Sequence, residues 1–320
     1  MTEPASPGDA VGPRGGDRPA VAVVGSVNLD TTVRVPHIPT AGETILASDT
    51  ASSPGGKGAN QAAAAAAAGA AVRFIGAIGA DAVGEAAVAG LRAFDVDLSE
   101  LQTVAHAPSG AATVVVADDA ENLIIVTSGA NDHLDPDLVA AALDRRAGPV
   151  LLTQLETPLA VLAECGRARA FAWRILNPAP ISADPGLRPL LAGFTLLVPN
   201  RTELAQLAGL PVPRTIAEVS ACVAALGFDG DVVVTLGADG AALYPAGGGA
   251  APEAPRTFAP PPVRAIDTTG AGDVFCGTLA SGLAAHGDLE RAVADAVEAS
   301  ARSTELPRAQ LVPGDAAVAR

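Results

Sequence analysis

The sequence is poor in cysteine, aromatic residues and positive charge, and each shortage excludes a class of protein. Three cysteines among 320 residues, none in a Cys-x-x-Cys pair, argue against a disulfide framework or a zinc site and favour a reducing compartment. Lys and Arg total 20 against 35 Asp and Glu, which gives a net charge of −15. So acidic a chain is not expected to bind nucleic acid or an anionic membrane.

Long hydrophobic runs are missing as well. The run of small apolar residues at 62–68 is too short and too weakly hydrophobic to span a bilayer, and no signal segment with a basic and then an apolar part opens the chain. The 4 histidines are scattered without the spacing of metal ligands. We therefore expect a cytoplasmic protein. Because 49% of the residues are hydrophobic and only 3% are aromatic, Ala, Val and Leu must fill its core.

Short apolar runs typical of buried strands alternate with helical patterns along most of the chain. The strand candidates are 20–25, 72–77, 149–153, 173–176, 194–198 and 231–236, and the helical patterns are 58–69, 82–94, 135–146, 157–170, 201–208 and 215–226. This alternation predicts an α/β fold with a doubly wound, mostly parallel sheet and helices on both faces. In such a fold, ligands bind outside the carboxyl ends of the strands.

Two regions break the alternation and predict a second, smaller sheet. Short strands at 31–35 and 43–51, and at 113–117 and 123–127, have no helix between them, and 118–122 is typical of a turn. We expect this sheet, drawn from about 31–51 and 97–127, to act as a lid over a cleft. Residues 1–18 are expected to be a disordered tail before one domain at 19–320, with a loop at 245–262.

The most informative stretch runs from Asp267 to Gly277, between a proline-rich, β-prone run at 258–266 and a helical pattern that ends near residue 286. Gly270, Ala271 and Gly272 leave almost no side chain at the helix start, so backbone N–H groups can surround an anion there. Asp273, in the first turn, can accept a proton from an attacking hydroxyl. An anion cradle beside a carboxylate suits phosphoryl transfer. A plain turn at the start of a helix is the alternative.

Two motifs near the amino end of the chain are candidates for binding a polar ligand. Asn28 and Asp30 follow the first strand and share one face of an extended segment, so they can grip vicinal hydroxyls, although an Asx turn is the alternative. Gly55-Gly56-Lys57-Gly58-Ala59-Asn60 opens an alanine-rich helix. It is not a Walker A loop, because no Ser or Thr follows Lys57. Lys57 and Asn60 lie on one side of the first turn, but a glycine turn with a solvated lysine is also consistent.

Three later candidates follow strand ends. Glu156 stands just past one strand, where a helix-starting acid is the alternative. Asn200 and Glu203 follow another strand and match a capping box, yet the same pair could order water around Mg²⁺. Thr235 and the turn Gly237-Ala238-Asp239-Gly240 either contact a nucleotide or form a simple hairpin.

Taken together and in this order, the motifs resemble the phosphofructokinase-B superfamily of ribokinase-like carbohydrate kinases, over residues from about 21 to 313. The resemblance implies a ribokinase-like fold, that is, a doubly wound domain whose β-sheet lid also forms a homodimer interface. It implies transfer of the γ-phosphoryl group of ATP to the 5-hydroxyl of D-ribose, with Mg²⁺ and a monovalent cation, usually K⁺, as cofactors.

The resemblance also implies a role for each matching residue. Asp273 is the general base, and Gly270, Ala271 and Gly272 form the anion hole. The sugar-binding positions are Asn28, Asp30, Gly55, Gly56, Lys57, Asn60, Glu156 and Asp273. The nucleotide positions are Asn200, Thr235, Gly237, Gly240 and Gly272. Glu203 is associated with Mg²⁺ through water, and Asp267 and Thr269 with the monovalent cation.

The chain departs from the family pattern near its carboxyl end. Cys276 stands where the family usually has Asn, and in the final loop, 304–313, Pro307 replaces the usual glycine and Leu311 the usual serine. These changes bear on nucleotide affinity and on activation by K⁺. Two other functions stay open: a kinase for deoxyribose, another sugar or a nucleoside, and a sugar- or nucleotide-binding relative without catalysis. Retention of Asp273 and the full Gly-Ala-Gly argues against the second.

Overall fold

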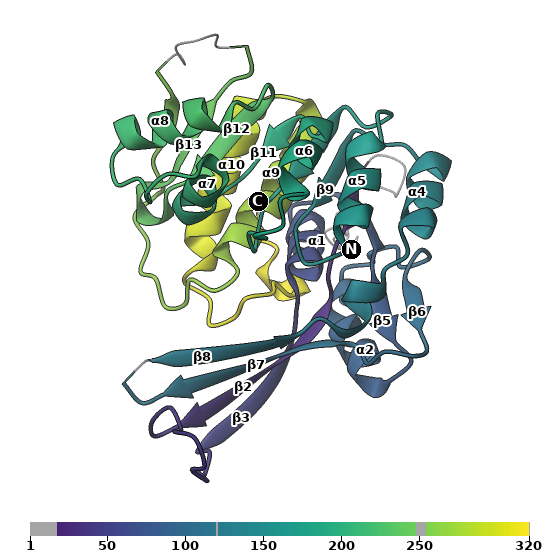
Figure 1. The fold of residues 1–320 in the computed structure, drawn as a ribbon, viewed down its shortest axis with the longest axis vertical. Helices are drawn as coiled ribbons and strands as arrows, with labels where there is room; N and C mark the ends of the chain where they lie inside the picture. Colours follow the sequence, from purple (N-terminus) through teal and green to yellow (C-terminus); the bar gives the residue numbers. More distant parts are fainter. Residues whose placement is uncertain (1–17, 120, 248–253, 320) are drawn as a thin grey trace, which may run out of the picture.

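An eight-stranded sheet forms the centre of the molecule (Figure 1). The computed structural model describes residues 18–119, 121–247 and 254–319. Six strands are parallel in the order β4-β1-β9-β10-β11-β12, and β13 and β14 continue the sheet antiparallel. Their bounds are β1 (Ala20–Val24), β4 (Ala71–Ile75), β9 (Val150–Thr153), β10 (Trp173–Leu176), β11 (Leu196–Leu197), β12 (Asp231–Thr235), β13 (Ala241–Tyr244) and β14 (Arg256–Phe258).

Helices cover both faces of this sheet, which confirms the predicted doubly wound α/β fold. One core cluster joins the sheet to α1 (Lys57–Ala67), α3 (Ala89–Ala93), α9 (Ala271–His286) and α10 (Leu289–Ser303). The other joins it to α4 (Pro136–Arg145), α5 (Leu159–Arg167), α6 (Leu187–Leu190), α7 (Arg201–Ala208) and α8 (Ile216–Leu226). The remaining helical segments are α2 (Ala82–Ala87), η1 (Gly129–His133), η2 (Leu191–Gly193), η3 (Gly237–Asp239) and η4 (Pro313–Asp315). No helix among the described residues is long and apolar enough to cross a membrane.

The alanine run of α1 lets this helix lie unusually close to α9. Residues Ala62 to Ala67 are all buried, and a Cβ placed on Gly277 of α9 would lie 2.4 Å from the Gln61 carbonyl oxygen of α1. Small side chains on both helices therefore allow their backbones to touch. This contact brings the amino-terminal turns of α1 and α9, each opened by glycines, to one place above the sheet.

A four-stranded sheet projects from the main body as the predicted lid (Figure 1). Its order is β3-β2-β7-β8, with bounds β2 (Asn28–Val35), β3 (Asp49–Gly55), β7 (Gly110–Ala117) and β8 (Asn122–Thr127). Residues 43–48, expected as strand, are irregular. The segment near residue 97 is not part of the lid either, because β6 (Gln102–Val104) pairs with β5 (Ala77–Gly79) in a separate two-stranded sheet.

Other expectations were wrong in detail. The predicted helix at 82–94 is divided at Val88, and α10 was not predicted at all. The run 259–266 is not a strand, because three consecutive prolines (260–262) cannot donate to a ladder, whereas β14 lies within the expected loop at 245–262. Residues 1–17 of the expected tail and residue 120 of the expected turn lie outside the described part of the chain.

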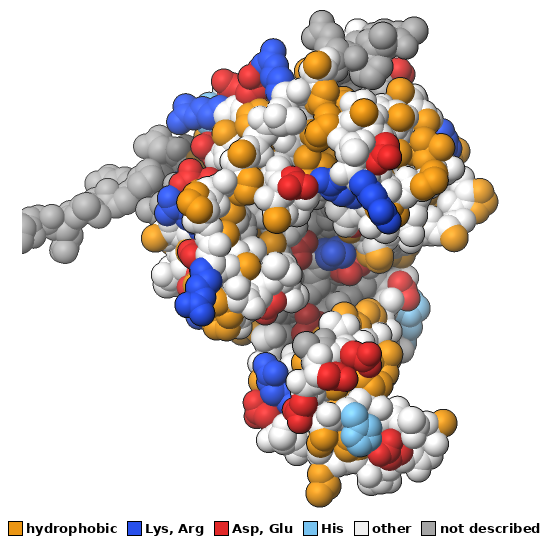
Figure 2. Space-filling view, turned by 90° about the vertical axis from the view of Figure 1, so that its left-hand side faces the viewer, with side chains coloured by type: hydrophobic (Ala, Val, Ile, Leu, Met, Phe, Trp, Pro, Cys, Tyr) orange, Lys and Arg blue, Asp and Glu red, His pale blue; other side chains and the backbone are white. Residues whose placement is uncertain are grey.

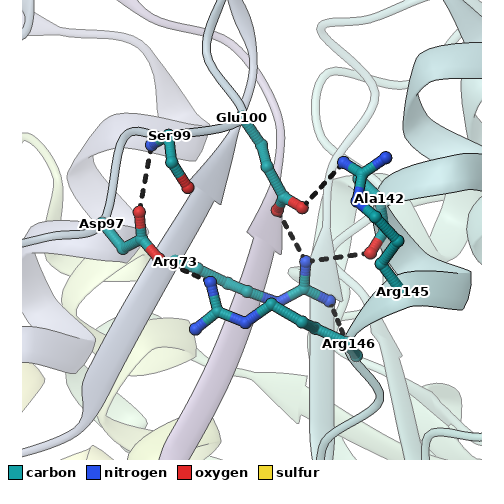
Figure 3. A network of polar contacts seen from close by, with 7 residues as sticks. All are labelled: Arg73, Asp97, Ser99, Glu100, Ala142, Arg145 and Arg146. Carbon is teal, nitrogen blue, oxygen red and sulfur yellow. Dashed lines mark hydrogen bonds and ion pairs between the residues drawn. The ribbon is translucent and has the colours of Figure 1, made fainter.

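An ionic network joins β4 to the loop after α3 and to the end of α4 (Figure 3). Arg73 of β4, almost fully buried, donates to Glu100 Oε2 at 2.7 Å and to the carbonyl oxygens of Ala142 and Arg146. Glu100 also accepts from Arg145, and Arg146 donates to Asp97 at 2.6 Å. The network ties α4 and the loop after α3 to the sheet edge, and every buried charge in it has a partner.

Candidate active site

Asp273 is the point at which the candidate residues converge. Its carboxylate is only 7% exposed, and each oxygen accepts one side-chain amide hydrogen: Oδ1 from Gln61 Nε2 at 3.0 Å and Oδ2 from Asn60 Nδ2 at 3.1 Å. Burial raises the pKa of Asp273, while Lys57 and the two amides oppose that rise. The site lies at the carboxyl ends of the parallel strands, as the fold predicts.

Asn28 and Asp30 stand at the root of β2, where the lid leaves the main body. The Oδ1 atom of Asn28 accepts from Asn131 Nδ2 at 2.8 Å, while Asn131 Oδ1 accepts the Val27 N–H at 3.0 Å. Asn131 thereby fixes the amide of Asn28, whose own NH₂ group donates to no described residue. Two residues further on, Asp30 points from the same side of the strand.

The Asp30 carboxylate is a buried acceptor without a donor. Its Oδ1 atom has no hydrogen-bond partner among the described residues, and its carboxylate lies directly over Gly55, where any Cβ would overlap it. Burial, followed by the charges of Glu156 and Asp273, raises the pKa of Asp30 to about 6. A buried acceptor that lacks a donor is costly, so this position suits a ligand that brings hydroxyl hydrogens.

Glu156 closes the start of α1. Its Oε2 atom accepts from Ser26 Oγ at 2.5 Å and from the Lys57 backbone N–H at 3.0 Å. Gly56, at φ 87°, packs directly against the start of β2. A Cβ on Gly56 would lie 2.9 Å from the Asn28 nitrogen, so no side chain fits there. Burial alone would lower the pKa of the Lys57 ammonium, but Asp273, Glu156 and Glu203 together raise it. Lys57 therefore stays charged between three carboxylates.

The start of α9 is open instead. Gly270 is the N-cap at φ 77°, where a side chain would collide with the Ala309 carbonyl oxygen, and Ala271 N donates to Thr268 O. The Gly272 N–H has no partner among the described residues, and a Cβ on Gly272 would meet nothing within 4 Å. A free N–H at the positive end of a helix dipole, with open space before it, is an anion-binding position.

A cavity of about 600 Å³ extends from this helix start. Thr235, Gly237, Gly240 and Gly272 all line it, with Pro260, Pro261, Pro262, Val263, Ala265, Phe275 and Val297 as largely apolar walls. Asn200 does not line it but pairs with Thr235 through an isolated β-bridge, which places the start of α7 beside the cavity. In Figure 2 the surface is hollowed where the lid meets the main body, and acidic and basic side chains gather there.

The residues expected near metal ions offer only oxygen ligands. Asn200 and Glu203 form a complete capping box, and this uses Glu203 Oε2 but not Oε1. Burial raises the pKa of Glu203, and the charge of Asp273 adds to the rise. One carboxylate fits Mg²⁺ that is held mainly by phosphates and water. No group of three acidic, His or Cys residues suited to hold a metal ion by themselves is found in the described chain.

The monovalent-cation position fits less completely. Asp267 Oδ1 accepts the Thr269 N–H at 2.8 Å, and both Ile266 and Asp267 donate their N–H groups to the Thr304 carbonyl oxygen. Leu311, which replaces the usual serine, is buried in a small apolar cluster and supplies no oxygen ligand from its side chain. Cys276 is likewise buried in the core, where it packs as an apolar residue.

Five amide side chains of the site had no role in the sequence-based prediction. Gln61 joins Asp273 to Asn177 and accepts from Gln154 at 2.6 Å, while Gln310 donates to Asn60 and Asn131 to Asn28. The only signal in the sequence was position, since Gln154 and Asn177 directly follow strands β9 and β10. Amides have no charge and no distinctive spacing, so only the fold identifies their partners.

Comparison with known proteins identifies relatives in sequence and in fold. A family model described as "pfkB family carbohydrate kinase" matches residues 18–313. A ribokinase of Haemophilus influenzae is 35% identical over 92% of this chain and 94% of its own length, and a deoxyribokinase of Salmonella typhimurium is 32% identical over 87% and 90%. The structure of Arabidopsis thaliana ribokinase complexed with ribose and ATP superposes with a TM-score of 0.80 and 30% identity, covering 95% of this chain and 99% of that one.

Proposed function

We propose that this chain, which belongs to the pfkB family of carbohydrate kinases, transfers the γ-phosphoryl group of ATP to the 5-hydroxyl of D-ribose. One observation carries the proposal: the buried Asp273 carboxylate, bonded by two amides of α1, directly follows Gly272, which has a free N–H and lines a largely apolar cavity. The likeness to ribokinases over most of the chain supports ribose as the acceptor.

The polar side chains at the start of β2 are suited to hold the sugar. Asn28 offers a free NH₂ group and Asp30 a carboxylate oxygen without a donor, so together they can bind vicinal hydroxyls of a pentose. Because both residues belong to β2, the strand that binds the sugar is also a strand of the lid. Closure of the lid would exclude water and limit the hydrolysis of ATP.

Asp273 acts as the general base. As the 5-oxygen forms its bond to the γ-phosphorus and the bond to the β-γ bridging oxygen breaks, the hydroxyl proton passes to Asp273. ADP leaves with the bridging oxygen. The two amides that bond Asp273 hold the carboxylate in place for this transfer. Positioning and charge stabilisation account for most of the catalysis in phosphoryl transfer.

The transferred group passes in front of the α9 start. The Gly272 N–H and the helix dipole stabilise its charge, and the Lys57 ammonium adds a positive charge from the α1 side. Glu203 would hold Mg²⁺ through water, and Mg²⁺ neutralises phosphate charge when bound. Asp267 and the Thr269 region would hold a monovalent cation, although the buried Leu311 leaves that position one hydroxyl short.

Release of ADP from the purified protein tests the proposal. The acceptors are D-ribose, 2-deoxyribose, other pentoses and a set of nucleosides, each with and without K⁺, and Asp273→Asn is the control. The highest kcat/KM with D-ribose supports the proposal. A preference for 2-deoxyribose would instead favour the deoxyribokinase function suggested by the Salmonella relative. If no acceptor stimulates the release of ADP, only a binding function would remain.

We further propose that the protein works as a homodimer in the cytoplasm. The edge strand β8 exposes four apolar side chains in succession, Leu123, Ile124, Ile125 and Val126, which therefore lie on both faces of the lid; such exposure is typical of a surface covered by a partner. The three cysteines are all buried and free, which suits a reducing compartment. Light scattering of the wild type and of Ile125→Lys tests the dimer, since the charged variant is expected to be monomeric.

A further inference from the structure

Gln310, in the loop after α10, is connected to the candidate base Asp273 through the side chain of Asn60. Its side chain is only 6% exposed, and its Nε2 atom donates to Asn60 Oδ1 at 3.1 Å across 250 residues of sequence. The other end of the same Asn60 amide donates to Asp273 Oδ2 at 3.1 Å. The three side chains therefore form one buried chain of hydrogen bonds that ends on the carboxylate.

We propose that Gln310 is a positioning residue, which holds the amide of Asn60 in the orientation that presents its NH₂ group to Asp273. The expected effect on kcat rests on the proposed function, whereas the effect on the orientation of Asn60 does not. An amide can rotate by half a turn at little cost when nothing distinguishes its two ends. In the rotated form, Asn60 would present Oδ1 to the carboxylate, and two acceptors would face each other. The donor from Gln310 prevents that rotation.

The other amide at Asp273 is held in a comparable way. Gln61 donates to Asp273 Oδ1, and Gln154 Nε2 fixes the orientation of Gln61 by donating to its Oε1 atom at 2.6 Å. Each amide that bonds Asp273 thus accepts a hydrogen bond from a further glutamine: Gln61 from Gln154, and Asn60 from Gln310. Gln154 follows the central strand β9, but Gln310 comes from the loop in which this chain departs from the family pattern.

The loop around Gln310 is anchored on both sides. Its neighbour Ala309 places a carbonyl oxygen against Gly270, and its other neighbour, Leu311, is buried in a cluster with Ala64, Ala67, Val274, Ala299 and Ala319. Arg308 and Asp315 form an ion pair at 3.3 Å beyond them. The replacement of serine by leucine at 311 therefore supplies an apolar anchor that fixes the position of Gln310.

Gly90 of α3 provides a way to displace Gln310 from outside the site. A Cβ on Gly90 would overlap the Oε1 atom of Gln310, and the next nearest atom outside that side chain is Pro54 Cβ at 3.7 Å. Gly90 has no positive φ, so an alanine there fits the helix without backbone strain. Gly90→Ala should move Gln310 away from Asn60 while leaving every residue of the site chemically intact.

The experiment compares the wild type with Gln310→Met, Gln310→Glu, Gly90→Ala and the exposed control Gln206→Met. We expect Gln310→Met and Gly90→Ala to lower kcat with ribose about tenfold, the effect of losing one buried hydrogen bond, with little change in the KM for ribose. Gln310→Glu accepts from the Asn60 NH₂ group and turns Oδ1 toward Asp273, so the acid limb of the kcat profile should move to higher pH. Gln206→Met should match the wild type.

The charged groups that face Asp273 are Lys57 of α1, Asp30 of β2, Glu156 after β9 and Glu203 of α7, with the Cys276 thiol on its own helix. None of them changes in these variants, but Gln310→Glu adds a carboxylate whose charge raises the pKa of Asp273 by itself. A change in the titration of Asp273 is therefore assigned to the Asn60 amide only in the neutral variants Gln310→Met and Gly90→Ala. The pKa of Asp273, followed by ¹³C NMR of its carboxyl carbon, should rise in Gln310→Met and Gly90→Ala, because the amide of Asn60 is no longer held as a donor to Oδ2, and it should rise further in Gln310→Glu.

The NMR measurement needs no turnover, so it separates this inference from the proposed function. An inactive wild type whose Asp273 titration still responds to Gln310→Met and Gly90→Ala would refute the kinase function and support the positioning role. Wild-type ribokinase activity combined with unchanged kcat and titration in Gln310→Met and Gly90→Ala would overturn the positioning role alone. A lower thermal midpoint with unchanged kcat and titration would also overturn it, since Gln310 would then serve stability only.

Discussion

The two glycine-opened helix starts, α1 and α9, have similar sequences but different structures. At α1, Glu156 accepts the Lys57 N–H, and Ser26 accepts the N–H groups of Gly58 and Ala59. No N–H group of that turn is left for a ligand. At α9, the Gly272 N–H is free and faces open space.

The difference shows that glycine serves two purposes at one site. In α1, Gly56 allows the loop after β1 and the start of β2 to approach the helix, and the side chains of Lys57 and Asn60 lie near Asp273. In α9, no atom lies within 4 Å of a Cβ built on Gly272, so the space before its N–H stays open. A glycine-rich helix start is therefore not by itself an anion site, because the protein can occupy the N–H groups first.

The largest expected effect follows from removing the carboxylate of Asp273, which lies in the first turn of α9 and is bonded by two amides of α1. Asp273→Asn should lower kcat by about 10²- to 10⁴-fold, the usual contribution of a general base. Ribose affinity, measured by calorimetry, should change little because Asn28 and Asp30 remain. Asp144→Asn, an exposed carboxyl group on α4, is the control. A variant with near-normal turnover would exclude Asp273 as the base.

Substitution at α1 should act on stability. Gly56→Ala forces a side chain into a backbone conformation at φ 87° and against Val27 and Asn28, so the free energy of unfolding should fall by about 3 kcal/mol. Gly69→Ala is the matched control, since φ is 101° there but nothing lies within 4 Å of the added Cβ. Equal losses in urea denaturation of the two variants would show that the close approach at Gly56 is unimportant.

Substitution at α9 should act on activity instead. The methyl group of Gly272→Ala would enter the open space before the free N–H, so kcat/KM for ATP should fall roughly 10- to 100-fold, at most the effect of losing an anion-hole donor. Stability should rise slightly, because Gly272 lies in the first turn of a helix. If this variant were both less stable and fully active, the proposed contrast between the helix starts would be wrong.

The smallest effect concerns Asp30 and pH. Its pKa of about 6 in the folded protein is above the ordinary value of 3.8, so the ionised form that accepts sugar hydroxyls is lost as pH falls through 6. Ribose affinity should therefore fall about tenfold between pH 7.5 and pH 5, since each unit below the pKa lowers the ionised fraction about tenfold. Because the pKa of Asp30 is higher in the folded than in the unfolded protein, its ionised form lowers the free energy of unfolding above pH 6. This loss of stability disappears as pH falls toward 4.

Asp30→Asn is the matched variant, because it keeps the shape of the side chain but does not titrate. Its ribose affinity should be lower at pH 7.5 and independent of pH between 5 and 7.5. Calorimetric titrations at four pH values provide the measurement. If the wild type and the variant followed the same pH dependence, another group would be responsible.

The sequence by itself determined the alternation of strands and helices, and with it the α/β class and the edge at which ligands bind. Periodicity and glycine placement are local properties, so they are visible in short windows of sequence. Local patterns failed where structure depends on a partner. The strand β14 is such a case, because it has only three residues and pairs with β13. The helix α10 is different: Asp288 caps it and its buried residues recur at helical spacing, so a local signal was present and was missed.

The contacts within the site were decided by the tertiary structure alone. Asn60 and Gln61 are 213 and 212 residues from Asp273 in sequence, and Gln310 is 250 residues from Asn60. No local signal encodes which amide meets which carboxylate, since an amide can donate or accept in any orientation. Likewise, the two glycine-rich helix starts are nearly interchangeable as sequence, and only the neighbours supplied by the fold leave one closed and the other free to bind an anion.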